Sequence, residues 1–136
     1  MKQLYILLLT SALLFSVYCC KKEDTSVSGD TNNFPSIPLN PSPSDSATGI
    51  DDSSAVVLSW ESTDPDIHDT LRFDVFAGSS LPLSNIPLAA DLSAATYNMG
   101  VLTFPGTTFY WQVKAKDNHG ASATGEVWQF TIRTRP

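Results

Sequence analysis

Two short polar segments each border an apolar stretch of the chain: residues 61–69, with four acidic side chains, and residues 117–120, with one. The residues with metal-binding chemistry in them are Asp64, Asp66, Asp69 and Asp117, with Asn118 and His119 beside the last. Carboxylate and amide oxygens are the ligands of Ca²⁺, which takes six to eight of them. Asp64-Pro65-Asp66 is also typical of an ordinary turn, closed by the first aspartate without any ion. Both interpretations stay open: a calcium site at the four aspartates, and a solvated turn.

Catalytic chemistry has little support in the sequence. The only histidines are His68 and His119, both in polar segments expected to be loops. The chain has no Gly-x-Ser-x-Gly, His-Glu-x-x-His or Gly-rich phosphate loop. Its formal charge of −6 would repel a phosphate backbone. We therefore expect neither an enzyme nor a nucleic-acid binder, and no cofactor apart from the calcium considered above.

Two aromatic side chains occupy the polar face of alternating segments. Phe76 and Tyr110 are expected on the side opposite the core, with Arg72 and Gln112 as polar neighbours. An aromatic platform with polar neighbours can stack on a sugar or pack against a protein. The alternative is ordinary cross-strand pairing, which stabilises a sheet by about 0.2–1 kcal/mol. These four residues form the predicted ligand face.

The segment that must hold this face is residues 107–117, in which apolar and polar side chains alternate strictly. Phe109, Trp111 and Val113 fall on one side and Tyr110 and Gln112 on the other, which predicts a half-buried antiparallel strand. Further strands are predicted at 37–43, 55–60, 70–77, 95–99 and 125–133, with an irregular edge segment at 81–90 and a turn at 44–54. About seven short antiparallel strands with no helical pattern predict an all-β fold, an immunoglobulin-like β-sandwich.

A targeting segment precedes the strands. Residues 1–19 have the form of a signal peptide, with Lys2 before an apolar run of about 14 residues. Val17-Tyr18-Cys19-Cys20 resembles a bacterial lipobox, in which the Cys after the cleaved bond is lipidated. Cys20 fits that position better, because Cys19 as the acylated residue would put bulky Tyr18 at the cleavage site. An ordinary secretory signal with two incidental cysteines remains the alternative.

The residues after Cys20 are polar and lack periodicity. We expect residues 20–36 to be a flexible tether with a reach of roughly 20–25 Å. Lys21-Lys22-Glu23-Asp24 is similar to the surface-export signal of Bacteroidota lipoproteins, and a generic linker is the alternative. These features predict a protein anchored by its N-terminal lipid to the bacterial outer membrane, at the cell surface.

The apolar segments together carry a family likeness over residues 37–135. The residues that carry it are Leu58-Ser59-Trp60, Asp64-Pro65-Asp66, Phe73-Asp74-Val75-Phe76, Tyr97, Leu102, the run from Pro105 to Asp117, and Trp128-Gln129-Phe130. They resemble a fibronectin type III-like domain, of the kind common in bacterial surface lipoproteins. The resemblance implies a β-sandwich over 37–136, in which segments 61–69 and 117–120 meet at one end. The family usually has Tyr where this chain has Phe109, so we expect that corner to be held by packing alone.

Three functions compete on this basis. The first is a non-catalytic binding or spacer module that contacts a protein or a glycan, or a calcium-binding adhesion domain. The second is an accessory subunit of a polysaccharide-handling enzyme or uptake system. The third is a structural protein that polymerises through sheet edges, which the prolines of residues 37–43 and at 82 and 87 disfavour.

Overall fold

The protein is an all-β sandwich, as predicted. The computed structural model describes residues 31–136, and the strands within that range are β1 (Leu39–Ser42), β2 (Ala47–Ile50), β3 (Ala55–Glu61), β4 (Arg72–Gly78), β5 (Ala89–Leu92), β6 (Thr96–Val101), β7 (Thr108–Lys116), β8 (Ser122–Thr124) and β9 (Trp128–Ile132). Residues 31–136 contain no helix that could span a membrane. The signal peptide, Cys20 and most of the tether lie outside the described residues.

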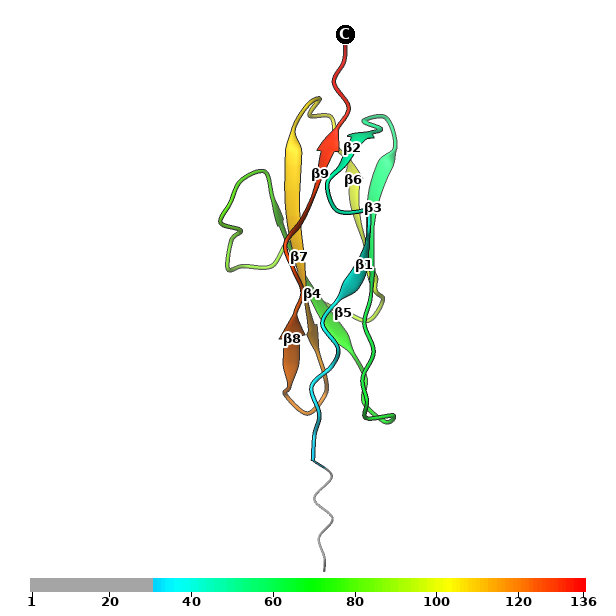
Figure 1. The fold of residues 1–136 in the computed structure, drawn as a ribbon, viewed down its shortest axis with the longest axis vertical. Coiled ribbons are helices and arrows are strands. Elements are labelled where there is room, and N and C mark those ends of the chain that lie inside the picture. Colours follow the sequence, from blue (N-terminus) through cyan, green and yellow to red (C-terminus); the bar gives the residue numbers. More distant parts are fainter. Residues whose placement is uncertain (1–30) are drawn as a thin grey trace, which may run out of the picture.

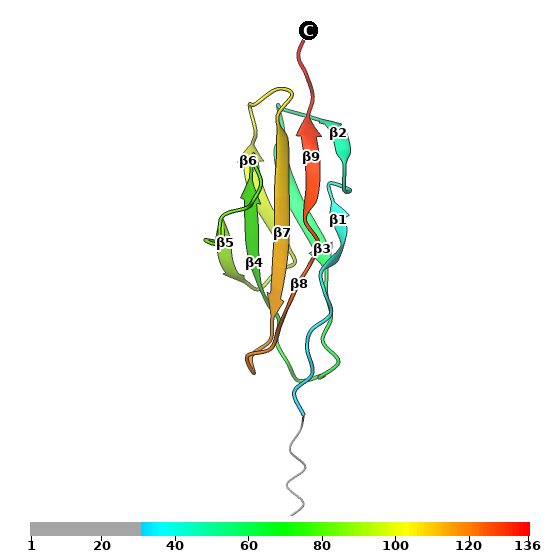
Figure 2. The same cartoon turned by 60° about the vertical axis from the view of Figure 1, so that its left-hand side comes forward.

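The strands form two sheets that face each other (Figure 1). One sheet has the order β1-β3-β6, and the other has the order β2-β9-β7-β4-β5, with β8 paired to β7. Figure 2 shows the second sheet in front, with β7 at its centre. Because β4 pairs with β7 along the whole length of β4, from Arg72 opposite Lys116 to Gly78 opposite Tyr110, the outer side chains of these strands share one face. We call this face the outer face.

The core lies between the sheets and consists mostly of side chains that the alternation assigned to it; Leu102, which was expected in a turn, is also buried, and Phe109 is only partly buried. The buried apolar residues are Val56, Leu58, Trp60, Phe73, Val75, Leu102, Trp111, Val113, Ala115, Trp128, Phe130 and Ile132. Trp111 lies between two other indoles, with ring centroids 6.4 Å from Trp60 and 4.8 Å from Trp128. Trp60 is therefore a core residue rather than an exposed stacking platform.

Two local predictions were wrong. The expected turn at 44–54 contains β2, which pairs in parallel with β9 as an edge strand. The expected last strand at 125–133 is shorter, because β9 spans only Trp128–Ile132 and residues 125–127, where the Gly125 N–H bonds to Val113 O at 2.9 Å, separate it from the short strand β8. The segment at 81–90 is irregular up to Leu88, as expected, and then enters the edge strand β5, whose pairing with β4 contains a register shift.

The corner before β7 is held by more than packing. Phe109 does pack, with ring centroids 5.7 Å from Phe130 and 6.2 Å from Phe104. However, the turn also closes on itself through the Thr107 N–H, which donates to Phe104 O at 3.1 Å. The Gly106 N–H donates to Ile132 O at 3.2 Å. Backbone hydrogen bonds therefore hold this corner together with packing, although Phe109 has no hydroxyl group to contribute one. The expectation that packing alone holds the corner was wrong.

Candidate functional site

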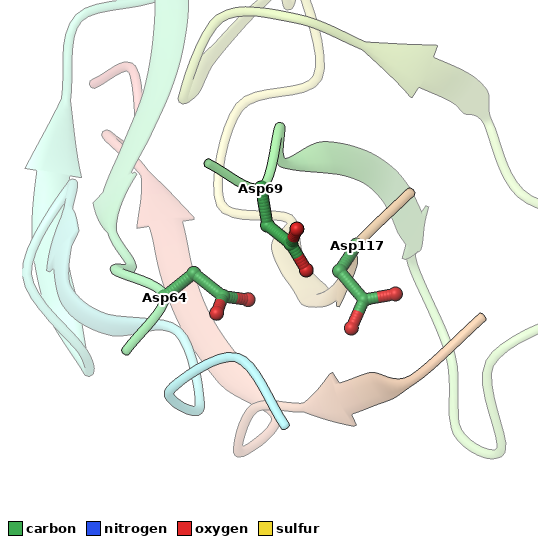
Figure 3. Close-up of side chains that lie close together, drawn as sticks. All are labelled: Asp64, Asp69 and Asp117. Atoms are coloured by element: carbon green, nitrogen blue, oxygen red, sulfur yellow. The ribbon is translucent and has the colours of Figure 1, made fainter. Parts of the chain in front are cut away.

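The structure brings three of the four predicted calcium ligands together. The carboxylates of Asp64, Asp69 and Asp117 each offer an oxygen, and these oxygens lie within 4.8 Å of one another (Figure 3). Asp64 and Asp69 come from the β3–β4 loop, and Asp117 directly follows β7. We call these three residues the acidic cluster. It lies at the end of the sandwich where the described chain begins, opposite the C-terminus (Figure 1).

Asp66 is not part of the acidic cluster. Its two oxygens accept the backbone N–H of Asn33 at 2.7 Å and the side-chain amide of Asn33 at 2.9 Å. These hydrogen bonds lower the pKa of Asp66. The expected four-aspartate set is therefore reduced to three, because the chain ahead of β1 occupies the carboxylate of Asp66.

Local turn chemistry accounts for the position of each carboxylate. Asp64 Oδ1 accepts the N–H of Asp66 at 2.8 Å, which is the turn that the Asp-Pro-Asp spacing predicted. Asp117 Oδ1 accepts the N–H groups of His119 and Ala121, each at 2.8 Å. Burial raises the pKa of Asp117, but these bonds and one from Asn32 outweigh it and hold that pKa below its ordinary value. Asp117 is thus a buried anion with its own donors.

One oxygen of the cluster has no donor. Asp64 Oδ2 is buried and has no hydrogen-bond partner within the part of the chain that the structure describes. Asp69, whose side chain is 3% exposed, faces His119 Nδ1 at 2.9 Å. Three carboxylates at this separation repel one another unless a positive group compensates. The arrangement can bind a cation or hold a protonated histidine.

His119 supplies part of that compensation, and this gives a pH prediction. The hydrogen bond and charge of Asp69 raise the pKa of His119 above 6.5. A raised folded-state pKa contributes stability that is complete below 6.5 and is lost as the pH rises through the folded value. We expect the stability advantage of the wild type over His119→Gln to be larger at pH 6 than at pH 8.5, as measured by urea unfolding. An advantage that stays constant across this range would contradict the prediction; His68→Gln, another exposed loop histidine, is the matched control.

The predicted ligand face is divided by the structure. Phe76 lies opposite Gln112 in the β4–β7 pair, and Tyr110 lies opposite Gly78, so the two aromatic residues are diagonal neighbours. Phe76 and Gln112 line an open groove with a volume of about 790 Å³. Tyr110 and Arg72 belong to the outer face but do not line this groove. Half of the predicted set is therefore brought into one concave surface.

The remaining lining comes from residues outside the predicted set of four. Residues 81–85 of the β4–β5 loop contribute to the groove, together with Lys114, Thr124 and Val127. This loop projects from the side of the sandwich (Figure 1). The signal available in the sequence was its unusual apolar content without alternation. We call this concavity the outer groove.

The outer groove has a defined polar interior. Gln112 Nε2 donates to Gly125 O at 2.9 Å, which fixes the amide and leaves its oxygen to accept a further hydrogen bond. Lys114 forms no ion pair with any described residue. By contrast, Lys116 Nζ lies 2.7 Å from Asp74 and 2.6 Å from Asp91. Lys114 lies opposite Asp74 in the β4–β7 pair, and its charge helps to lower the pKa of Asp74. The groove can therefore offer a ligand one acceptor and one ammonium group that forms no direct ion pair with a described residue.

Comparisons with known proteins bear on the fold. No protein-family model and no curated protein matches the chain. The structure is similar to part of an alpha-L-rhamnosidase from Dictyoglumus thermophilum, with a TM-score of 0.60 and 16% identity over 76% of this chain. This chain covers only 13% of the length of that rhamnosidase.

The chain is also similar to a structure of domain size. The fibronectin type III domain of human fibronectin type III domain containing protein 3 matches with a TM-score of 0.51 and 20% identity. That match covers 77% of this chain and 92% of the other. Such low identities establish the fold and nothing finer. The described chain is a fibronectin type III-like β-sandwich.

Proposed function

We propose that this protein is a non-catalytic binding module that contacts a protein or glycan partner through the outer groove. The observation that carries the proposal is that Phe76 and Gln112, selected from the sequence as ligand-face residues, line one groove together with the β4–β5 loop. The loop also presents apolar side chains to solvent, with Leu81 56% and Ile86 79% exposed. Exposed apolar surface beside a concavity is typical of an interaction site.

The proposal includes attachment to the bacterial outer membrane through a lipid on Cys20, with the module at the cell surface. The lipobox-like sequence supports it, and so does the absence of other cysteines to pair with Cys19 and Cys20. The described chain begins at the acidic end of the sandwich, so a tether from there would leave the outer groove on the flank of the molecule (Figure 1). Such a position is accessible from the side.

Metabolic labelling with palmitate tests the anchor. Cys20→Ala is expected to lose the label and Cys19→Ala to keep it. Protease treatment of intact cells then tests the location, because a surface protein is degraded and a periplasmic one is protected. Retained label in Cys20→Ala would contradict the assignment of the acylated residue.

The binding role is tested with a glycan array and with chemical cross-linking in cells, comparing the wild type with Phe76→Ala. We expect the variant to lose the signal in whichever experiment gives one. Val57→Ala is the matched control, because Val57 is 47% exposed and lies on β3 in the other sheet. A signal that Phe76→Ala retains would contradict the outer groove as the site. Accessory action in a polysaccharide-handling system, the alternative role, would appear as a glycan signal and as faster hydrolysis when the chain is added to a partner glycosidase.

A calcium-binding role for the acidic cluster is the second candidate. The observation that favours it is the convergence of Asp64, Asp69 and Asp117 together with the buried, donorless Oδ2 of Asp64. A cation there would offset the repulsion between the carboxylates and complete the environment of that oxygen. Because the cluster joins the β3–β4 loop to the residue after β7, an ion would tie together two loops far apart in the sequence.

Asp64→Asn separates the calcium hypothesis from a purely structural role. Its Oδ1 can still accept the N–H of Asp66, so the turn is retained. With chelator present, we expect the variant to melt at or above the wild-type temperature, because one repulsive charge is removed. With millimolar Ca²⁺, the wild type should gain several degrees in melting temperature and Asp64→Asn should gain little. Glu126→Gln, an exposed carboxylate away from the cluster, is the control, and an unchanged wild-type melt in Ca²⁺ would exclude the site.

A further inference from the structure

The loop beside the outer groove has no charged residue. From Ser79 to Leu88 the sequence is Ser-Ser-Leu-Pro-Leu-Ser-Asn-Ile-Pro-Leu, and the exposed apolar side chains in it are Leu81 (56%), Ile86 (79%) and Leu88 (50%). Val127, at the opposite side of the groove, is 41% exposed. Apolar surface in contact with water therefore borders the groove on both sides. A partner that covers this surface would gain about 25 cal/mol of binding free energy for each Å² removed from water.

Positive charge is distributed unevenly over this acidic protein. Three of the five cationic side chains in residues 31–136 are ion-paired: Lys116 with Asp74 and Asp91, and Arg133 and Arg135 with Asp52. The other two, Arg72 and Lys114, have no ion pair among the described residues. Both lie on β4 and β7, whose outer side chains form the outer face. Of the cations without a direct ion pair, Lys114 thus lies in the outer groove, where Asp74 opposite it offsets part of its charge, and Arg72 lies on the same outer face but outside the groove.

We propose that the occupant of the outer groove is a segment of a partner protein that combines bulky apolar side chains with a carboxylate for Lys114. This inference rests on the proposed binding role of the groove and specifies its ligand. Apolar walls fit leucine- or phenylalanine-like side chains, and the unpaired ammonium complements a negative charge. A sugar fits less well, because Gln112 Nε2 is already committed to Gly125 O and the loop offers mainly alkyl surface to hydroxyl groups.

Selection from a random 12-residue peptide library displayed on phage tests this chemistry. The full chain, in detergent micelles, is immobilised through a tag after Pro136, which lies at the far end of the sandwich from the acidic cluster (Figure 1). We expect the selected peptides to share bulky apolar residues and at least one Asp or Glu. Binding of the synthetic peptides, measured by fluorescence polarisation, should weaken about tenfold in Lys114→Glu and in Leu81→Asp. Val57→Asp, on the other sheet, should bind as the wild type does.

A charge exchange makes the test specific for the ion pair. When the acidic residue of a selected peptide is changed to Lys, binding to the wild type should fall and binding to Lys114→Glu should recover. Folding of each variant is checked by its melting curve, and Lys114→Gln serves if the charge reversal unfolds the protein. Peptides without carboxylates, or peptides that bind Lys114→Glu unchanged, would overturn the inference.

The outcomes also separate this inference from the proposed function. If selected peptides depend on Leu81 but not on Lys114, the groove binds partners and the proposed acidic ligand is wrong. If a glycan signal depends on Phe76 and no peptide is selected, the groove binds glycans and the inference fails alone. If sedimentation shows a dimer that Leu81→Asp dissociates, the occupant is a second copy and the inference again fails. If neither peptide nor glycan binding depends on any groove residue, both proposals fail.

Discussion

Replacement of Trp111 by alanine is expected to lower the free energy of unfolding by about 3–5 kcal/mol. The Trp111 side chain is completely buried in the central strand of the larger sheet. Its ring centroid lies 6.4 Å from that of Trp60 in the opposite sheet and 4.8 Å from that of Trp128 on the neighbouring strand. Alanine would leave a cavity that these rings could fill only partly. Because domains of this size are stable by about 5–15 kcal/mol, the variant should be marginal or unfolded at 37 °C.

Urea unfolding monitored by circular dichroism measures this loss, and two variants bracket it. Trp111→Phe keeps most of the ring volume, and it removes an indole N–H that is buried without an acceptor among the described residues. It should therefore cost clearly less than alanine. Tyr110→Ala changes the adjacent residue on the outer face and should cost least of the three. A loss below about 1.5 kcal/mol for Trp111→Ala would show that the core does not depend on this ring.

The success of the core prediction has a simple cause. In β7 the two faces meet different environments, so the alternation of Trp111, Val113 and Ala115 with polar residues encodes their burial directly. The same reasoning applies to β3, where Val56, Leu58 and Trp60 are buried. Apolar and polar residues alternate visibly in the sequence wherever one face of a strand packs in the core and the other face contacts water.

β2 lacks such a pattern and was therefore missed. Its four residues, Ala47 to Ile50, are small or polar except at the end, and Gly49 has a φ of +73°. The strand exists because β9 offers a free edge to it, with Ala47 opposite Phe130. That edge is more than 80 residues away in the chain, so no local property of residues 44–54 could reveal it.

The candidate sites divide in the same way. The acidic cluster was predictable because the family resemblance placed its two loops at one end of a sandwich, and Asp64, Asp69 and Asp117 do meet there. The exclusion of Asp66 was not predictable, because it results from the hydrogen bond that Asn33 donates to it, and the polar sequence had assigned Asn33 to the tether. The outer groove was half predicted: its strand residues alternate, but its β4–β5 loop has no pattern that fixes where the loop lies.

Removing both Arg133 and Arg135 is expected to destabilise the protein more than removing their common partner, Asp52. The Asp52 side chain is fully buried, and its two oxygens accept hydrogen bonds from Arg133 Nε at 2.7 Å and Arg135 Nε at 2.5 Å. The arginine side chains are 49% and 59% exposed. In Asp52→Asn the arginines stay about half exposed and Arg133 keeps its ion pair with Asp51 at 3.2 Å, whereas in Arg133→Ala/Arg135→Ala a carboxylate stays buried without a counterion. Stranding a buried charge is the costlier of the two changes.

The pH dependence identifies the cause of this loss. In the wild type, burial raises the pKa of Asp52, but the hydrogen bonds and charges of the two arginines outweigh burial and hold the pKa below 3.8. Without the arginines only burial remains, so the pKa should lie above 3.8. In the wild type, the stability that ionised Asp52 contributes is present above pH 3.8 and is lost as the pH falls through the folded-state pKa. In the double variant, protonation of Asp52 at low pH removes the buried charge and with it the destabilisation. The difference in urea midpoint between the two proteins should therefore be large at pH 7 and small at pH 3, with Lys114→Ala as a control in which an unpaired cation is removed. Equal differences at both pH values would mean that the arginines stabilise the C-terminal end by packing and not by neutralising Asp52.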